Sequence, residues 1–174
     1  MVFKPGYHTP PHLFMADWLY MLTGSTYQRQ PLMQSDDRKK EWVETFFTAS
    51  ELYHWDILAW VVMDNHYHTI LKSPLRKPDN LTKFVASYHK FTAQKWNIQD
   101  GSVGRKVWWN YWDTSIRGED DYLNRLRYVF WNPVKHGLVQ EPAEYPYCNY
   151  NDFLHEEWFD LGEDPVEVEN VPEF

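Results

Sequence analysis

Two histidines and a tyrosine–asparagine pair are the residues of this chain whose types and spacing could do chemistry. His66 and His68 lie two apart in an expected strand, so both side chains should point to one face of a sheet. They could share a divalent metal, or they could be ordinary surface histidines. Tyr128 and Asn132 lie four apart on an expected helix and share a helix face. An amide oxygen suits a magnesium-class ion; the alternative is that Tyr128 packs and Asn132 ends the helix.

The elements that must position these residues follow from hydrophobic periodicity. Strands are expected at residues 15–27, 55–63, 66–72 and 107–116, and helices at 36–53, from 80 to about 97, and from 119 onward. The third helix should be disturbed near Pro133, because the residue before a proline resists the helical conformation. This order suits an α+β, ferredoxin-like split βαβ fold. Its antiparallel sheet would carry the helices on one face and leave the other face for binding.

The charges are placed unevenly along the chain. Residues 72–135 hold 12 Lys and Arg against six Asp and Glu, whereas residues 154–174 hold eight acids and no base. A basic middle rich in Tyr and Trp could hold a phosphate backbone and stack bases. A solvated surface with a disordered acidic tail is the plainer explanation. We expect a domain over residues 1–153 and an acidic tail over 154–174, which Trp158, Phe159 and Leu161 could dock on the protein.

Composition excludes several protein classes. The single cysteine, Cys148, allows no internal disulfide and no Cys-rich zinc module. No apolar run reaches the roughly 18 residues that a membrane span needs, and the first residues do not have the pattern of a signal peptide. The composition therefore predicts a cytoplasmic protein without a membrane partner.

Two segments resemble a known family, the REP-associated tyrosine transposases, a branch of the single-tyrosine HUH transposases. The first is VVMDNHYHTIL at residues 61–71, and the second is RYVFWNPVKHGLV at residues 127–139. Between them lies an aromatic strand that ends in Ile-Arg before an acidic helix start, VWWNYWDTSIRGEDDY. The resemblance covers about Met15 to Tyr150, and the run from Asn132 to Gly137 is its most specific part.

The resemblance implies a metal-dependent single-stranded DNA endonuclease and strand transferase that acts at hairpin or REP-like sequences through a 5′-phosphotyrosine intermediate. By position, Tyr128 matches the nucleophile, and the ligands of Mg²⁺ or Mn²⁺ would be His66, His68 and Asn132. The expected partner is single-stranded DNA with a hairpin, bound by a monomer or a homodimer. Tyr67 stands where the family more usually has a large apolar residue, and it should point away from the histidines.

Side chains near these motifs are candidates for DNA contacts. The basic candidates are Lys72, Arg117, Arg127 and Lys135, and the candidates for base stacking are Trp108, Trp109, Tyr111 and Trp112. Two other functions stay open: a catalytically silent, sequence-specific binder of DNA or RNA hairpins, and a metal-binding protein without a nucleic-acid role. A gel assay on labelled single-stranded DNA with Mg²⁺ separates the three functions. The nuclease predicts a covalent adduct, the silent binder a reversible complex, and the metal-binding protein neither.

Overall fold

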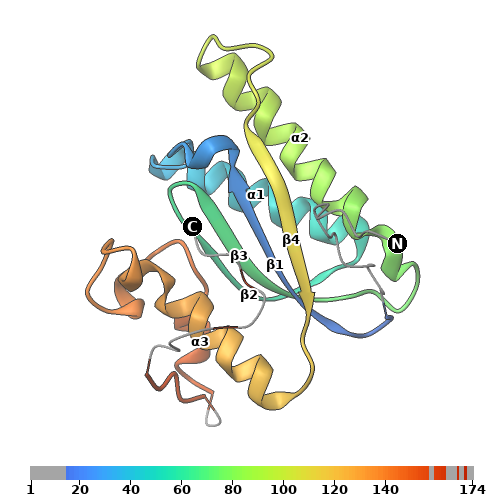
Figure 1. The fold of residues 1–174 in the computed structure, drawn as a ribbon, viewed down its shortest axis with the longest axis vertical. Helices are drawn as coiled ribbons and strands as arrows, with labels where there is room; N and C mark the ends of the chain where they lie inside the picture. The colour runs from blue at the N-terminus through green and yellow to red at the C-terminus, as the bar shows by residue number, and fades with distance from the viewer. Residues whose placement is uncertain (1–14, 157–158, 164–167, 169–170, 172–174) are drawn as a thin grey trace, which may run out of the picture.

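Four strands form one antiparallel sheet in the computed structural model, which describes residues 15–156, 159–163, 168 and 171 (Figure 1). The strands are β1 (Leu19–Thr26), β2 (Asp56–Val62), β3 (His66–Lys72) and β4 (Trp108–Ser115), in the spatial order β2-β3-β1-β4. The helices are α1 (Asp36–Tyr53), α2 (Leu81–Gln99), α3 (Glu119–Lys135) and the short α4 (Tyr150–Phe153). Three 3₁₀ turns complete the described elements: η1 (Tyr27–Arg29), η2 (Pro78–Asn80) and η3 (Pro142–Glu144).

The predicted α+β, ferredoxin-like split βαβ fold is confirmed. β3 lies between β1 and β2 and is antiparallel to both, which is the inserted strand of the split unit. α1 and α2 cover one face of the sheet, as expected. Aromatic side chains fill that layer: Trp42 and Phe46 of α1 stack with ring centroids 4.6 Å apart, and Trp42 also contacts Tyr67 of β3 at 4.5 Å.

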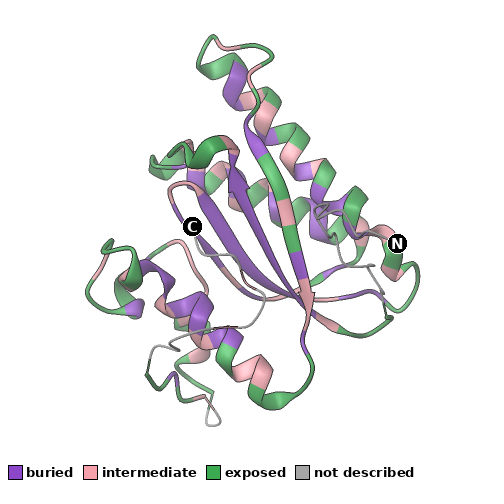
Figure 2. Ribbon diagram, in the orientation of Figure 1, coloured by how far each residue is buried: buried purple, intermediate pink, exposed green. Residues whose placement is uncertain are grey.

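α3 lies on the opposite face of the sheet, which differs from the expectation that the helices would share one face. Its apolar residues Leu126, Val129 and Phe130 form a second core with Met21 and Ile70 of the central strands. The physical reason is that nearly all residues of β1 and β3 are buried, as the colours of Figure 2 show, and successive side chains of a strand point to opposite faces. A sheet that is apolar on both faces needs a second cover, and α3 provides it.

α3 also continues past Pro133, where a disturbance was expected. The helix runs to Lys135 and ends in a Schellman motif, in which Leu138 N–H donates to the Pro133 carbonyl (2.9 Å) and Gly137 N–H to the Val134 carbonyl (2.9 Å). Gly137 has φ 67°, the left-handed conformation that this motif requires. The expectation was wrong because helical hydrogen bonds resume directly after Pro133, where His136 N–H donates to the Asn132 carbonyl (3.0 Å), and tertiary packing buries Asn132, the residue before the proline.

The chain after α3 returns along the outer edge of β2. Tyr145 O–H donates to the Val62 carbonyl (2.6 Å), and the Asn149 side chain bonds the backbone of Leu58 (3.0 Å) and Trp60 (2.9 Å). Beyond residue 154, Phe159 and Leu161 pack on the second core, whereas Trp158 lies outside the described residues. None of the helices in the described ranges has the length and apolar content to cross a membrane.

Candidate active site

The two histidines of β3 point toward α3. Both are fully buried, and their ring centroids are 5.0 Å apart. The register between β1 and β3 places Thr23 directly opposite His68, and the Thr23 hydroxyl lies 2.8 Å from the His68 Nδ1 atom. Thr23 therefore fixes the orientation of the His68 ring.

His66 is held on both sides of its ring by amide oxygens. Its Nδ1 atom lies 2.7 Å from the Asn65 Oδ1 atom, and its Nε2 atom lies 3.0 Å from the Asn132 Oδ1 atom. Asn65 Nδ2 donates to the Arg29 carbonyl (3.1 Å), which fixes the direction of that amide. Because Asn65 Oδ1 can only accept, His66 Nδ1–H is the donor, and the lone pair of a neutral ring lies on Nε2, toward Asn132.

Burial keeps both imidazoles neutral at pH 7. Loss of hydration lowers the pKa of His66 to about 4, with further lowering by the nearby charges of His136 and Arg29 and partial compensation by Asn132. Burial also lowers the pKa of His68 well below its ordinary value, with smaller contributions from His66, His136 and Lys135. A neutral imidazole is the form of histidine that binds a metal.

The tyrosine and asparagine of the second motif lie on the face of α3 that meets these histidines. The Tyr128 ring centroid is 5.0 Å from that of His68, and Tyr128 is 6% exposed. Asn132, one turn later, contacts His66 through its side-chain oxygen. Lys135 lies over the Tyr128 ring, with its Nζ atom 5.1 Å from the centroid. The fold thus brings His66, His68, Tyr128 and Asn132 into one cluster.

Three further residues belong to this cluster and were missed from sequence. The His136 ring lies 4.9 Å from that of His66, and burial, with the charge of Lys135, lowers its pKa. Its place four residues after Asn132 was a readable signal, because such residues share a helix face. Thr23 and Asn65 could not be found from sequence, since their roles depend on strand register and on the turn before β3.

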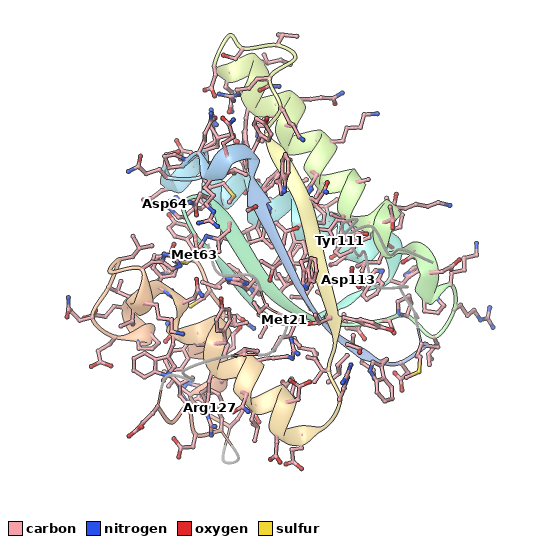
Figure 3. All side chains as sticks on the ribbon, viewed as in Figure 1. Met21, Met63, Asp64, Tyr111, Asp113 and Arg127 are labelled. Atoms are coloured by element: carbon pink, nitrogen blue, oxygen red, sulfur yellow. The ribbon has the colours of Figure 1, made fainter. Side chains whose placement is uncertain are left out.

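The basic candidates are spread over the molecule. Lys135 is exposed beside Tyr128. Arg127 is turned toward the C-terminal segment, where its Nε atom donates to the Leu161 carbonyl (2.8 Å); Figure 3 labels it on α3. Lys72 lies at the far end of β3 from His66, about 20 Å along the strand, in an ion pair with Asp17 (2.6 Å). Arg117 is exposed just before α3.

The aromatic candidates of β4 divide between the two faces of the sheet. Trp108 is 8% exposed, donates through Nε1 to the Thr92 hydroxyl (2.9 Å) and stacks on His89 with ring centroids 4.2 Å apart. It is therefore a core residue, and the expectation that it stacks on DNA bases was wrong. Tyr111 also packs on the α1–α2 side, with its hydroxyl 3.1 Å from that of Thr82 (Figure 3). Trp112 pairs with Thr23 and therefore shares the histidine face, where it is 39% exposed.

No group of three His, Cys, Asp or Glu side chains arranged to hold a metal ion occurs within the described ranges. A metal at this site would therefore depend on the Asn132 amide oxygen in addition to the two imidazoles.

Comparisons with known proteins agree with the motifs. No family model matches the chain. It is 30% identical over 98 residues to a REP-associated tyrosine transposase of Escherichia coli (strain K12), covering 55% of this chain and 54% of the relative. It is 24% identical over 123 residues to a Haemophilus influenzae protein assigned provisionally to that family, covering 66% and 70% of the two chains. The match thus spans about half the length of the first relative.

A solved structure of a REP-associated tyrosine transposase bound to a REP hairpin has the same fold. It superposes with a TM-score of 0.75 at 18% identity and covers 96% of this chain and 98% of its own. This agreement supports the architecture described above. In sequence and in fold, the chain resembles the REP-associated tyrosine transposases.

Proposed function

We propose that this chain is a metal-dependent nuclease and strand transferase for single-stranded DNA that carries a hairpin, with Tyr128 as its nucleophile. The observation that carries the proposal is the meeting of two motifs about sixty residues apart. Tyr128 contacts His68 and Asn132 contacts His66, so the tyrosine lies beside a set of nitrogen and oxygen donors. The names of the relatives and of the structural neighbour agree with this chemistry. We propose residues 1–153 as the catalytic domain, with residues 154–174 appended to it.

The donor set suits Mg²⁺ or Mn²⁺ held by His66, His68 and Asn132. Neutral His66 directs a lone pair from Nε2 toward the Asn132 oxygen, 3.0 Å away. Two lone pairs at that distance repel each other unless the Asn132 amide turns over or a cation lies between them. A divalent ion bound there would be held by His66 Nε2 and Asn132 Oδ1 together and would remove this repulsion. A bound ion would polarise the scissile phosphate and neutralise charge in the transition state.

In the proposed reaction, the Tyr128 hydroxyl oxygen attacks the phosphorus and forms a tyrosine–phosphate bond while the bond from phosphorus to the 3′ oxygen breaks. The phenol loses its proton and the leaving oxygen gains one, so the products are a 5′-phosphotyrosine and a free 3′-hydroxyl. The reverse attack by a 3′-hydroxyl rejoins DNA and releases the tyrosine. The positive charge of Lys135 over the Tyr128 ring favours the negative charge that develops on the phenol oxygen.

Access to the nucleophile requires a local rearrangement. Tyr128 is 6% exposed, so a phosphate must displace neighbouring atoms to reach its hydroxyl. Lys135 is the residue best placed to move, because it is exposed and ends in a flexible four-carbon stem. Drawn to the DNA phosphate, it would uncover the ring and keep its charge close to the reacting oxygen.

The test is adduct formation on labelled, hairpin-bearing single-stranded DNA with Mg²⁺ or Mn²⁺, read on a denaturing protein gel. Wild-type protein should form a covalent adduct, and Tyr128→Phe should form none while its affinity for DNA stays unchanged. Tyr122→Phe is the matched control, since this half-buried tyrosine lies on the same helix but away from the histidines. An adduct that persists in Tyr128→Phe would disprove the assignment. A reversible complex without any adduct in wild type would indicate the silent hairpin binder.

A further inference from the structure

A second aromatic and basic cluster lies at the end of β1, next to the histidine end of β3. It surrounds a hollow of about 380 Å³, within the range of small-ligand sites. Its lining residues are Ser25, Thr26, Tyr27, Gln28, Arg29 and Trp109. Of these, Arg29 was described above for the contact of its carbonyl with Asn65 and for its effect on the pKa of His66, and Trp109 was an aromatic candidate from sequence.

Two aromatic rings line one side of this hollow, and a lysine lies over both of them. The Tyr27 and Trp109 rings lie 5.3 Å apart at 36°. The Lys106 Nζ atom lies 4.1 Å from the Trp109 centroid and 4.7 Å from the Tyr27 centroid. Trp109 is 48% exposed, which is a large apolar surface to leave in water. Exposed rings beside mobile cations are the combination with which proteins bind single-stranded nucleic acids, because rings stack on bases and cations contact phosphates.

The turn that forms the hollow is built in an unfavourable backbone conformation. Gln28 and Arg29 of η1 have φ of 55° and 56°, in the left-handed region that residues other than glycine rarely adopt. Each such residue costs about 1–3 kcal/mol unless its surroundings enforce it. Here Tyr27 N–H donates to the Val107 carbonyl (2.7 Å), and the Thr26 hydroxyl donates to the Gln30 carbonyl (2.6 Å). The turn is therefore fixed in position against β4.

The same turn is connected to the histidine pair. Ser25 of the hollow is the direct cross-strand partner of His66. The Arg29 carbonyl accepts from Asn65, whose other amide atom bonds the His66 ring. The hollow thus begins one strand, about 4.8 Å, from the proposed metal ligands. A DNA strand that presents a phosphate at the histidines must continue over this hollow or leave in the opposite direction.

We propose that this hollow binds one unpaired nucleotide adjacent to the scissile phosphate, with its base against Trp109 and Tyr27 and its phosphate between Lys106 and Arg29. The inference rests on the proposed function, since it takes single-stranded DNA as the ligand. It adds a subsite that positions the strand. Lys106 would leave the ring faces when a base enters and would move to the phosphate, which its exposed side chain permits.

The test measures binding of fluorescein-labelled oligothymidylate by fluorescence anisotropy, in EDTA so that no cleavage occurs. Trp109→Ala should weaken binding about 5- to 150-fold, the equivalent of one stacked base. Trp109→Phe should retain most of the affinity because a ring remains. Trp18→Ala is the matched control: Trp18 is 37% exposed but precedes the opposite end of β1, and its loss should leave affinity unchanged.

Two further measurements identify the groups involved. Lys106→Gln should lower the slope of log affinity against log salt by about 0.7, the loss of one phosphate contact, whereas Trp109→Ala should leave that slope unchanged. Irradiation of wild-type protein with oligothymidylate that contains 5-iododeoxyuridine should crosslink the peptide that carries Trp109 or Tyr27. This crosslink decides the matter even where a variant fails to fold.

Equal affinity of Trp109→Ala and Trp18→Ala, or crosslinks only elsewhere, would overturn the subsite. The aromatic cluster would then serve only to stabilise the turn. Its failure is separable from that of the proposed function. If wild type forms no covalent adduct but its affinity for DNA still depends on Trp109, the nuclease is refuted and the subsite is kept. If wild type forms the adduct and its affinity does not depend on Trp109, the subsite is refuted and the nuclease is kept. Absence of oligothymidylate binding by wild type overturns the subsite.

Discussion

Lowering the pH from 7 to 5 should destabilise this protein because histidines are buried in their neutral form. His66 has a pKa of about 4 in the folded chain, against about 6.5 when it is exposed. At pH values between these two pKa values, His66 is protonated in the unfolded chain but stays neutral in the folded chain, so acid shifts the equilibrium toward unfolding. The stability that His66 contributes is complete above pH 6.5, falls as the pH decreases toward 4, and changes little below that.

The size of the effect follows from the two pKa values. At pH 5, protonation lowers the free energy of the unfolded chain by about 2 kcal/mol and that of the folded chain by less than about 0.1 kcal/mol. His66 alone should therefore lower the free energy of unfolding by about 2 kcal/mol between pH 7 and 5. Burial also lowers the pKa of His68 and His89, so they add to the loss. Carboxylates titrate mostly below this window.

Urea unfolding at pH 7 and pH 5 in EDTA measures the difference directly. The variant His66→Gln should lose about 2 kcal/mol of the pH dependence, whatever its stability at pH 7. His155→Gln removes an exposed histidine and should retain the full difference. Two results would refute the conclusion that His66 is buried as a neutral imidazole, the form that binds a metal. One is a decrease in the wild-type free energy of unfolding between pH 7 and 5 of less than about 1 kcal/mol, and the other is the same decrease in His66→Gln as in wild type.

Three other changes give independent checks. Gly24→Ala should cost at least about 1–3 kcal/mol in urea unfolding, because a Cβ there would overlap the Tyr67 hydroxyl across the strand pair; equal stability would show that the ring can move. Phe159→Ala should cost about 2–4 kcal/mol, since this ring packs on Phe130 at 6.1 Å; no change would mean that the C-terminal segment does not dock. Saturating Mn²⁺ at about 100 times its Kd should stabilise wild type by about 2.7 kcal/mol and stabilise Asn132→Ala less, by calorimetry; equal stabilisation would remove Asn132 from the ligand set.

The local pattern of the sequence determined most of the elements. The helix expected at 36–53 and the strand expected at 66–72 have the same bounds in α1 and β3. Both have strong local signals: Ser35 caps the first turn of α1 by accepting from Arg38 N–H (3.3 Å), and the histidine strand follows a tight turn. The residues of the candidate site were also predicted, because His66 with His68 and Tyr128 with Asn132 are each related by the period of one element.

Only the tertiary structure decided how these elements face each other. A β-bulge between Gly24 and Thr26 shifts the register of β4, so that Trp108 enters the core while Trp112 shares the histidine face. α3 packs on the second face of the sheet, which brings His136 and Lys135 to the cluster, and Arg127 turns to the C-terminal segment. Local periodicity specifies which residues share a face of one strand or helix. Which element packs on which face depends on long-range burial of both faces of the central strands. One inserted residue in a strand moves the following side chains to the opposite face of the sheet.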